Sequence, residues 1–120
     1  MGAKSFEELY AWQLAVQVRE RGIGICEIPR VARDFTFCDA FREAARSAPN
    51  LIAEGFGRFT HRQFRHYLSM ARAELLEVQN DLVDLKSRKW VPDEDVDSLH
   101  DLADHAARVT SKLRSSIPDD

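Results

Sequence analysis

Apolar residues recur every three or four positions along the second half of the chain, which is the spacing of a helix. The clearest run follows Thr60, and its members would form one stripe along a helix: Phe64, Leu68, Ala71, Leu75, Val78, Leu82 and Leu85. Thr60 and Gln63 form a capping-box pair, because their side chains can satisfy the first unpaired backbone N–H groups. The pattern predicts a helix over residues 60–88, roughly 40 Å long at ~1.5 Å per residue.

Two outer segments show the same periodicity. Residues 92–117 open with Pro92 and three acidic residues, a composition that suits the first turn and the positive dipole end of a helix. Residues 5–27 carry apolar residues at helical spacing, and Gly22 and Gly24 weaken the end of this helix by ~1 kcal/mol each relative to alanine. We therefore expect a helix in each segment.

A further helix is predicted over residues 37–54, after a connection formed by residues 28–36. Pro49 lies inside this helix, where it removes one backbone hydrogen bond and predicts a bend. Gly55 follows the helix directly, and we expect it to end the helix in the left-handed conformation that glycine tolerates.

Four helices with short connections predict an all-α fold, an antiparallel up-down-up-down four-helix bundle that forms one domain over residues 1–120. The segments lack the alternating β-branched and aromatic pattern of strands. A second apolar stripe, formed by Leu76, Val83 and Trp90, repeats every seven residues on another face of the 60–88 helix. We interpret this stripe as a candidate oligomer interface.

The bulk composition indicates a soluble globular protein. Hydrophobic residues make up 44% and charged residues 31%, and uncharged runs fall far short of the roughly 20 apolar residues that a membrane span needs. The first residues lack a targeting signal, so we expect a cytoplasmic protein without a membrane partner. Cys26 and Cys38 are then expected to be free thiols, with an intramolecular bridge as the less favoured alternative.

Charge is unevenly distributed, although the net charge is only −3. Residues 58–72 contain no acid, and their arginines are the candidate nucleic-acid-binding residues: Arg58, Arg62, Arg65 and Arg72. These side chains could neutralise phosphates, with Phe59 or Tyr67 available for base stacking. They could equally be solvated, or pair with acids of residues 93–97 on a neighbouring subunit.

Two arrangements around residues 50–58 could carry chemistry. The run Gly55-Phe56-Gly57-Arg58 is rich in glycine like a phosphate-binding loop, but it lacks the Lys-Ser/Thr ending and follows a helix, so we interpret it as a turn. Asn50 and Glu54 share one helical face without a partner acid or base. We expect Glu54 to be partly buried and to satisfy backbone donors or a nearby arginine.

Histidine and aspartate pairs at i and i+4 occur in the last segment, as His100 with Asp104 and Asp101 with His105. Two ligands bind a metal weakly, so we interpret these pairs as part of a solvated face. The Glu-x-x-His motif of di-iron bundles is absent from the sequence. We therefore expect no catalytic residues, no metal and no cofactor.

The run of residues 45–58 resembles the pattern of a four-helix bundle family first noticed as products of intervening sequences within bacterial 23S ribosomal RNA genes. The residues that carry this motif are Pro49, Asn50, Ile52, Ala53, Glu54, Gly55, Phe56, Gly57 and Arg58. The opening Phe6-Glu7-Glu8-Leu9 with Trp12-Gln13 and the segment from Phe64 to Leu85 are similar as well. The resemblance therefore covers nearly the whole chain.

The resemblance implies a bacterial cytosolic protein that assembles into a ring-like homopentamer, and it implies no established biochemical activity. A more distantly similar protein, the accessory variability determinant of diversity-generating retroelements, binds nucleic acid and a reverse transcriptase. We therefore expect a non-enzymatic, self-assembling bundle that binds a nucleic-acid partner related to ribosomal RNA, or a protein partner. The alternatives are a bundle that binds a small ligand or metal, and a purely structural protein.

Overall fold

The computed structural model describes residues 2–119, and in this range the chain is helical without strands, as predicted. The elements are a 3₁₀ turn, η1, and the helices α1 to α5. Their bounds are Phe6–Glu8 for η1, Tyr10–Ile25 for α1, Pro29–Ala32 for α2, Phe35–Phe56 for α3, His61–Arg88 for α4 and Asp93–Ser116 for α5. The four long helices α1, α3, α4 and α5 confirm the predicted bundle.

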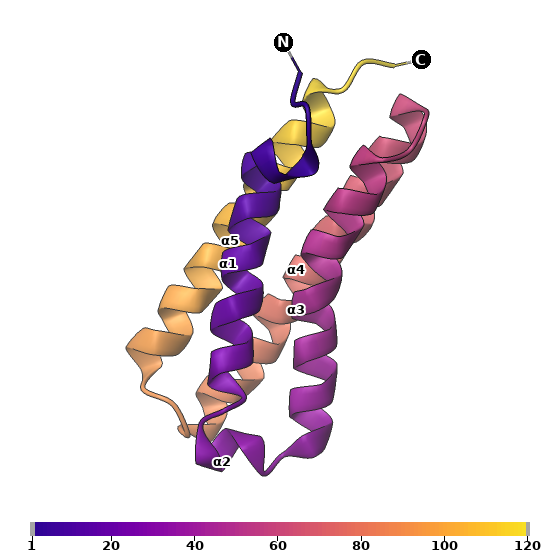
Figure 1. Cartoon of the computed structure of the whole chain (residues 1–120). Helices are drawn as coiled ribbons and strands as arrows, with labels where there is room; N and C mark the ends of the chain where they lie inside the picture. The colour runs from indigo at the N-terminus through magenta and orange to yellow at the C-terminus, as the bar shows by residue number, and fades with distance from the viewer. Residues whose placement is uncertain (1, 120) are drawn as a thin grey trace.

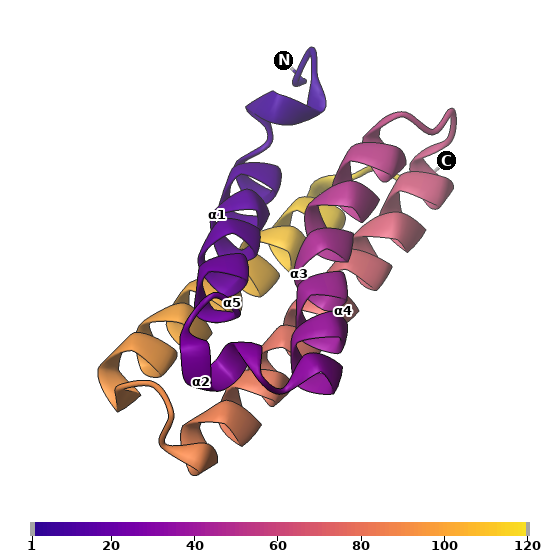
Figure 2. The ribbon, with the colours of Figure 1, turned by 60° about the horizontal axis from the view of Figure 1, so that its bottom comes forward.

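The long helices form a closed ring of neighbours. Helix α1 packs against α3 and α5, and α4 packs against the same two helices from the other side. Both ends of the chain lie at one end of the bundle, and α2 lies at the opposite end (Figure 1; Figure 2). The molecule measures 48 × 22 × 19 Å, so its two ends are well separated surfaces.

Two segments differ from the predicted bounds. The helix expected from residue 5 begins only at Tyr10, because Leu9 is extended and η1 turns back so that Phe6 meets Trp12 edge-on at 5.3 Å. The predicted connection 28–36 contains the short helix α2. Proline suits the first turn of this helix, and Val31 within it is fully buried against the core.

The predicted apolar stripe of α4 forms the centre of the core. Its members from the second turn onward have no exposed surface: Leu68, Ala71, Leu75, Val78, Leu82 and Leu85. The helix starts where the sequence predicts, because the Thr60 hydroxyl accepts a hydrogen bond from the backbone N–H of Gln63 at 3.1 Å. Within residues 2–119 no buried side-chain polar atom lacks a hydrogen-bond partner.

The role predicted for Gly55 is wrong. Helix α3 continues through this residue to Phe56, its C-cap is Gly57 at φ −80°, and none of the described glycines has a positive φ. Gly55 is instead a point of close helix packing, since a Cβ atom placed there would lie 2.6 Å from the Cβ of Tyr67 on α4. Helix α3 also stays one helix across Pro49, and the bend expected there stays a prediction.

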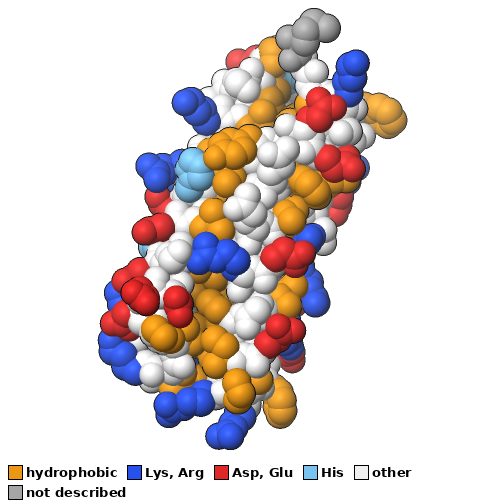
Figure 3. Space-filling model, turned by 60° about the vertical axis from the view of Figure 1, so that its left-hand side comes forward, with side chains coloured by type: hydrophobic (Ala, Val, Ile, Leu, Met, Phe, Trp, Pro, Cys, Tyr) orange, Lys and Arg blue, Asp and Glu red, His pale blue; other side chains and the backbone are white. Residues whose placement is uncertain are grey.

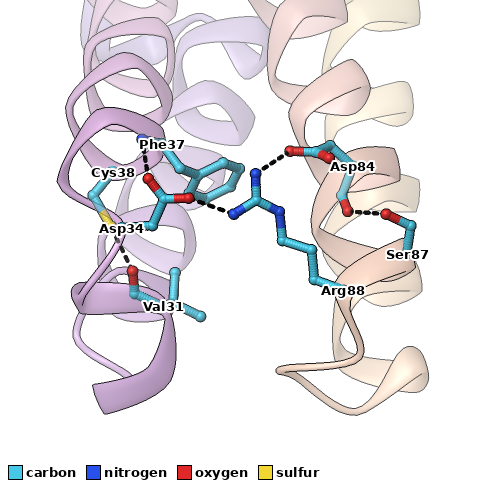
Figure 4. Close-up of polar contacts among 7 residues, drawn as sticks. All are labelled: Val31, Asp34, Phe37, Cys38, Asp84, Ser87 and Arg88. Carbon is cyan, nitrogen blue, oxygen red and sulfur yellow. Dashed lines mark hydrogen bonds and ion pairs between the residues drawn. The ribbon is translucent and has the colours of Figure 1, made fainter.

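One arginine ties the start of α3 to the end of α4 (Figure 4). The carboxylate of Asp34 accepts a hydrogen bond from the backbone N–H of Phe37 at 3.0 Å and another from Arg88. Arg88 also pairs with Asp84 at 3.0 Å. Its guanidinium lies over the rings of Phe37 and Trp90, 5.6 and 5.0 Å from their centres. The Phe37 N–H, with Arg88 second, holds the pKa of Asp34 below its usual value.

The contact at Gly55 predicts the effect of adding one methyl group. Gly55→Ala should lower the free energy of unfolding by about 1–3 kcal/mol, because α3 must move away from α4 to admit the Cβ atom. Urea denaturation followed by circular dichroism measures this change. Gly24→Ala is the matched control: its Cβ meets nothing within 4 Å, so it should be neutral or stabilising. Equal effects of the two substitutions would contradict the close packing.

The lowered pKa of Asp34 predicts a pH-dependent contribution to stability. Asp34→Asn keeps a good helix cap but removes the ion pair with Arg88, so the variant should unfold at lower urea concentration than the wild type at pH 7. The difference in stability between the two proteins should shrink as the pH falls below 3.8, the ordinary pKa of an aspartate, toward the lower pKa of Asp34 in the folded state. There the wild-type carboxylate becomes protonated and loses its ion pair. A difference that stayed constant down to low pH would argue against the ion pair.

Candidate nucleic-acid interface

The first of the four predicted arginines, Arg58, is engaged within the chain. It lies in the turn between α3 and α4, and its guanidinium donates a hydrogen bond to the Tyr67 hydroxyl. It also lies over the Tyr67 ring, 4.7 Å from the ring centre. Arg58 thus holds Tyr67, the residue against which Gly55 packs, and its role in the turn is structural.

Arg62 and Arg65 lie on the first turns of α4, at the end of the bundle that carries the termini (Figure 1). Arg62 is exposed. Arg65 is half-buried, donates a hydrogen bond to the carbonyl of Pro118 and pairs with Asp119 at 3.5 Å. Arg65 therefore holds the residues after α5 against the start of α4.

Arg72, the fourth predicted arginine, lies in a shallow depression between α4 and α5 with a volume of about 250 Å³. We call it the Arg72–Arg114 depression, and its lining residues are Leu68, Ser69, Arg72, Ser111, Arg114 and Ser115. Both arginines are exposed, and no described carboxylate pairs with either. Two guanidinium groups without a counter-charge are thus brought together here.

Sequence reasoning missed Arg114 as a member of the candidate site. A signal was present, since Ser69-x-x-Arg72 on α4 and Ser111-x-x-Arg114 on α5 repeat one pattern. Residues three apart share a helical face, so each pattern places a hydroxyl beside a guanidinium. Because α4 and α5 pack side by side, the residues of both patterns line one depression.

The motif of residues 49–58 divides between the core and the solvent. Its buried members are Pro49, Ile52 and Gly55, and Ala53 and Phe56 are half-buried. The expectation that Glu54 is partly buried is wrong: the residue before Gly55 faces outward, and Glu54 is exposed with Asn50 at a shallow groove between α3 and α4. Gly57 and Arg58 are also exposed, so the motif mainly organises the α3–α4 contact.

The candidate interface stripe lies mostly outside the core. Leu76 is 40% and Val83 60% exposed, whereas Trp90 is half-buried beneath Arg88. Acids lie on another flank of α4, where Glu74 is ~160° round the helix from Leu76 and borders the groove with α3: burial, and then the neighbouring Glu77, raise the pKa of Glu74. Burial and Glu77 also raise the pKa of Asp81. The ionised acids are thus disfavoured here, and the oligomer interface stays a prediction.

Two of the four polar candidates on α5, His105 and Asp104, have neighbours within the chain. The Tyr10 hydroxyl lies 3.1 Å from Nε2 of His105, and Asp104 pairs with Arg108 at 3.0 Å. Among residues 2–119, no three His, Cys, Asp or Glu side chains are grouped as metal ligands would be. Both cysteines are buried and free, and burial beside Cys38 raises the pKa of the Cys26 thiol to about 12.

No described helix has the length and apolar character needed to cross a membrane. No curated protein matches the chain. Residues 7–112 match the family described as 23S rRNA-intervening sequence protein. This range contains α1 to α4 and most of α5, including Ser69, Arg72 and Ser111 of the depression, while Arg114 and Ser115 lie beyond it. Because the match covers far more than half of the residues, the chain belongs to the 23S rRNA-intervening sequence protein family.

Proposed function

We propose that this protein is a non-enzymatic, self-assembling bundle that binds nucleic acid through the arginines of α4 and α5. The observation that supports this proposal is the Arg72–Arg114 depression, where two exposed guanidinium groups lack a carboxylate partner. A guanidinium group offers several N–H donors in a plane and binds a phosphate through two of them at once. Two such groups in one depression fit two oxygens of one phosphate, or two neighbouring phosphates of a strand.

Local charge, and not the net charge, would support this binding. The whole chain carries −3, but residues 58–72 contain no acid, and no described carboxylate pairs with Arg72 or Arg114. Attraction between exposed charges fades beyond ~10 Å at moderate salt concentration, so a phosphate in the depression would respond to these two unpaired arginines and little to the acids at the far end of the bundle. Binding should therefore depend strongly on salt.

Self-assembly would use the outer face of α4. Leu76 and Val83 expose apolar surface on the same side of α4 as Arg72, about one and three turns further along the helix, and the inner stripe of α4 is already filled. Covering them with a second copy would remove this surface from water, and it would multiply the number of arginine depressions on one particle. Repeated weak phosphate sites on one assembly bind a long strand more tightly than one site does.

The depression predicts which charges matter for RNA binding. Arg72→Gln combined with Arg114→Gln should weaken binding of a fluorescently labelled single-stranded RNA at least tenfold. It should also make the dependence on salt shallower by roughly 1.4 in logarithmic slope, because two phosphate contacts are lost. Fluorescence anisotropy over a range of NaCl concentrations measures both changes.

A matched control removes the same charge elsewhere: Arg46→Gln combined with Lys112→Gln. Both residues are exposed, on α3 and α5, outside the depression. The control should retain most of the binding. Equal weakening in the two double variants would show that only the total charge matters, and unchanged binding in Arg72→Gln with Arg114→Gln would refute the site.

The outer face of α4 predicts an oligomer that one pair of substitutions should dissociate. Leu76→Asp with Val83→Asp should lower the mass in multi-angle light scattering to that of the 13.7 kDa protomer, because charges replace the apolar surface. The fold should survive, since both side chains are exposed. Phe59→Ser, at a fully exposed site outside this stripe, should leave the mass unchanged. A wild-type protein of protomer mass would refute self-assembly.

A further inference from the structure

A second depression lies at the opposite end of the bundle, beside α2. It has a volume of about 550 Å³ and is lined by residues from α2, the start of α3 and the α4–α5 turn: Arg30, Arg33, Asp34, Phe35, Thr36 and Trp90. This volume is within the range of small-molecule sites. Figure 3 shows lysine or arginine side chains beside exposed hydrophobic side chains at this end of the molecule. Residues 28–36, predicted from the sequence only as a connection, supply most of this lining.

Two aromatic rings form part of the lining, and one of them is held in place. Phe35 is 75% exposed, and no described ring stacks on it. Trp90 is half-buried, with the Arg88 guanidinium 5.0 Å from its ring centre. Because Arg88 is itself fixed by Asp34 and Asp84, the indole packs against a group that is held in place (Figure 4 shows the arginine and both acids). The depression thus offers a prepared stacking surface and a free ring.

Two cations line the same depression without partners. Arg30 and Arg33 are exposed, and no described acid pairs with either. The only carboxylate in the lining, Asp34, is already bound by Arg88 and by the backbone N–H of Phe37. The nearby Lys89 is paired with Asp93 at 2.8 Å. The charge available to a ligand in the depression is therefore positive.

From this combination we infer that the depression binds a nucleoside phosphate, with the base stacked against Phe35 and Trp90 and the phosphate against Arg30 and Arg33. A purely apolar ligand would make no use of the two arginines, and a bare anion would make none of the two rings. The same chemistry is found in a free nucleotide and in an unpaired nucleotide of a strand. The site goes beyond the Arg72–Arg114 depression, which offers guanidinium and hydroxyl groups but no aromatic ring.

The two tryptophans of the chain make the test direct. The indole N–H signals of Trp12 and Trp90 can be followed by ¹⁵N nuclear magnetic resonance and assigned with Trp12→Phe. Trp90 lines the depression, whereas Trp12 lies at the other end beside Phe6. Adenosine monophosphate should shift the Trp90 signal in a saturable way and leave that of Trp12 in place. Adenosine and inorganic phosphate should each bind at least tenfold more weakly.

Substitutions separate stacking from charge. Phe35→Ala should weaken binding of adenosine monophosphate by roughly 5- to 100-fold, the range expected for losing one base–ring stack. Arg30→Gln with Arg33→Gln should weaken it at least tenfold, while leaving any binding of adenosine unchanged. The matched control is Phe59→Ala, which removes a fully exposed ring from the opposite end and should change nothing.

The results distinguish a free nucleotide from an unpaired nucleotide of a strand, and they test the inference itself. A Trp90 shift with adenosine monophosphate supports a free nucleotide, and a shift only with a short single-stranded RNA supports an unpaired nucleotide of a strand. No saturable Trp90 shift with either probe would overturn the inference, as would equal affinity for inorganic phosphate or equal loss of binding in Phe59→Ala. Arg72→Gln with Arg114→Gln should leave the response to adenosine monophosphate intact, so this site and the proposed RNA surface can fail separately.

Discussion

Burial of one apolar stripe fixes how α4 is turned in the bundle, and it thereby decides which residues of this helix reach the surface. This helix contacts both α3 and α5, and six of its side chains are completely removed from water. Burying each large apolar side chain contributes about 1.5–3 kcal/mol, so turning the helix would lose far more free energy than any surface contact could contribute. Adjacent residues of a helix point ~100° apart, so the buried stripe places Arg72 on the flank of α4 that borders α5, and it places Leu76, four residues further on, on the same flank.

Helix starts that depend on local residues were predicted from the sequence, whereas a close approach between two helices was not. Residues 60–88 and 92–117 were predicted to within about a residue of α4 and α5, because Thr60 and Pro92 mark starts that depend on local chemistry alone. Gly55 was misread because a glycine after a helical run has two explanations, a left-handed turn or a neighbour too near for a Cβ atom. Only the position of Tyr67 distinguishes them.

The candidate sites show the same limit at longer range. Arg72 could be named from the sequence because it falls in a stretch without acids. Arg114 could not, since its pairing with Arg72 depends on the register between α4 and α5. Phe35 and Trp90 are 55 positions apart and line one depression only because the end of α4 lies beside the start of α3 in the folded bundle. A pattern within one helix is visible in the sequence, whereas a site assembled from several helices depends on the packing that follows.

The ion pairs of Arg88 connect the fold to the depression beside α2. Taken alone, an exposed ion pair adds little to stability. Here Asp34 uses one carboxylate both to cap α3 and to bind Arg88, and Arg88 in turn covers Trp90. The arrangement neutralises the one acid in the lining and fixes one aromatic ring, while Arg30 and Arg33 stay unpaired. The same contacts that hold the start of α3 against the end of α4 therefore leave a positive, aromatic surface open to solvent.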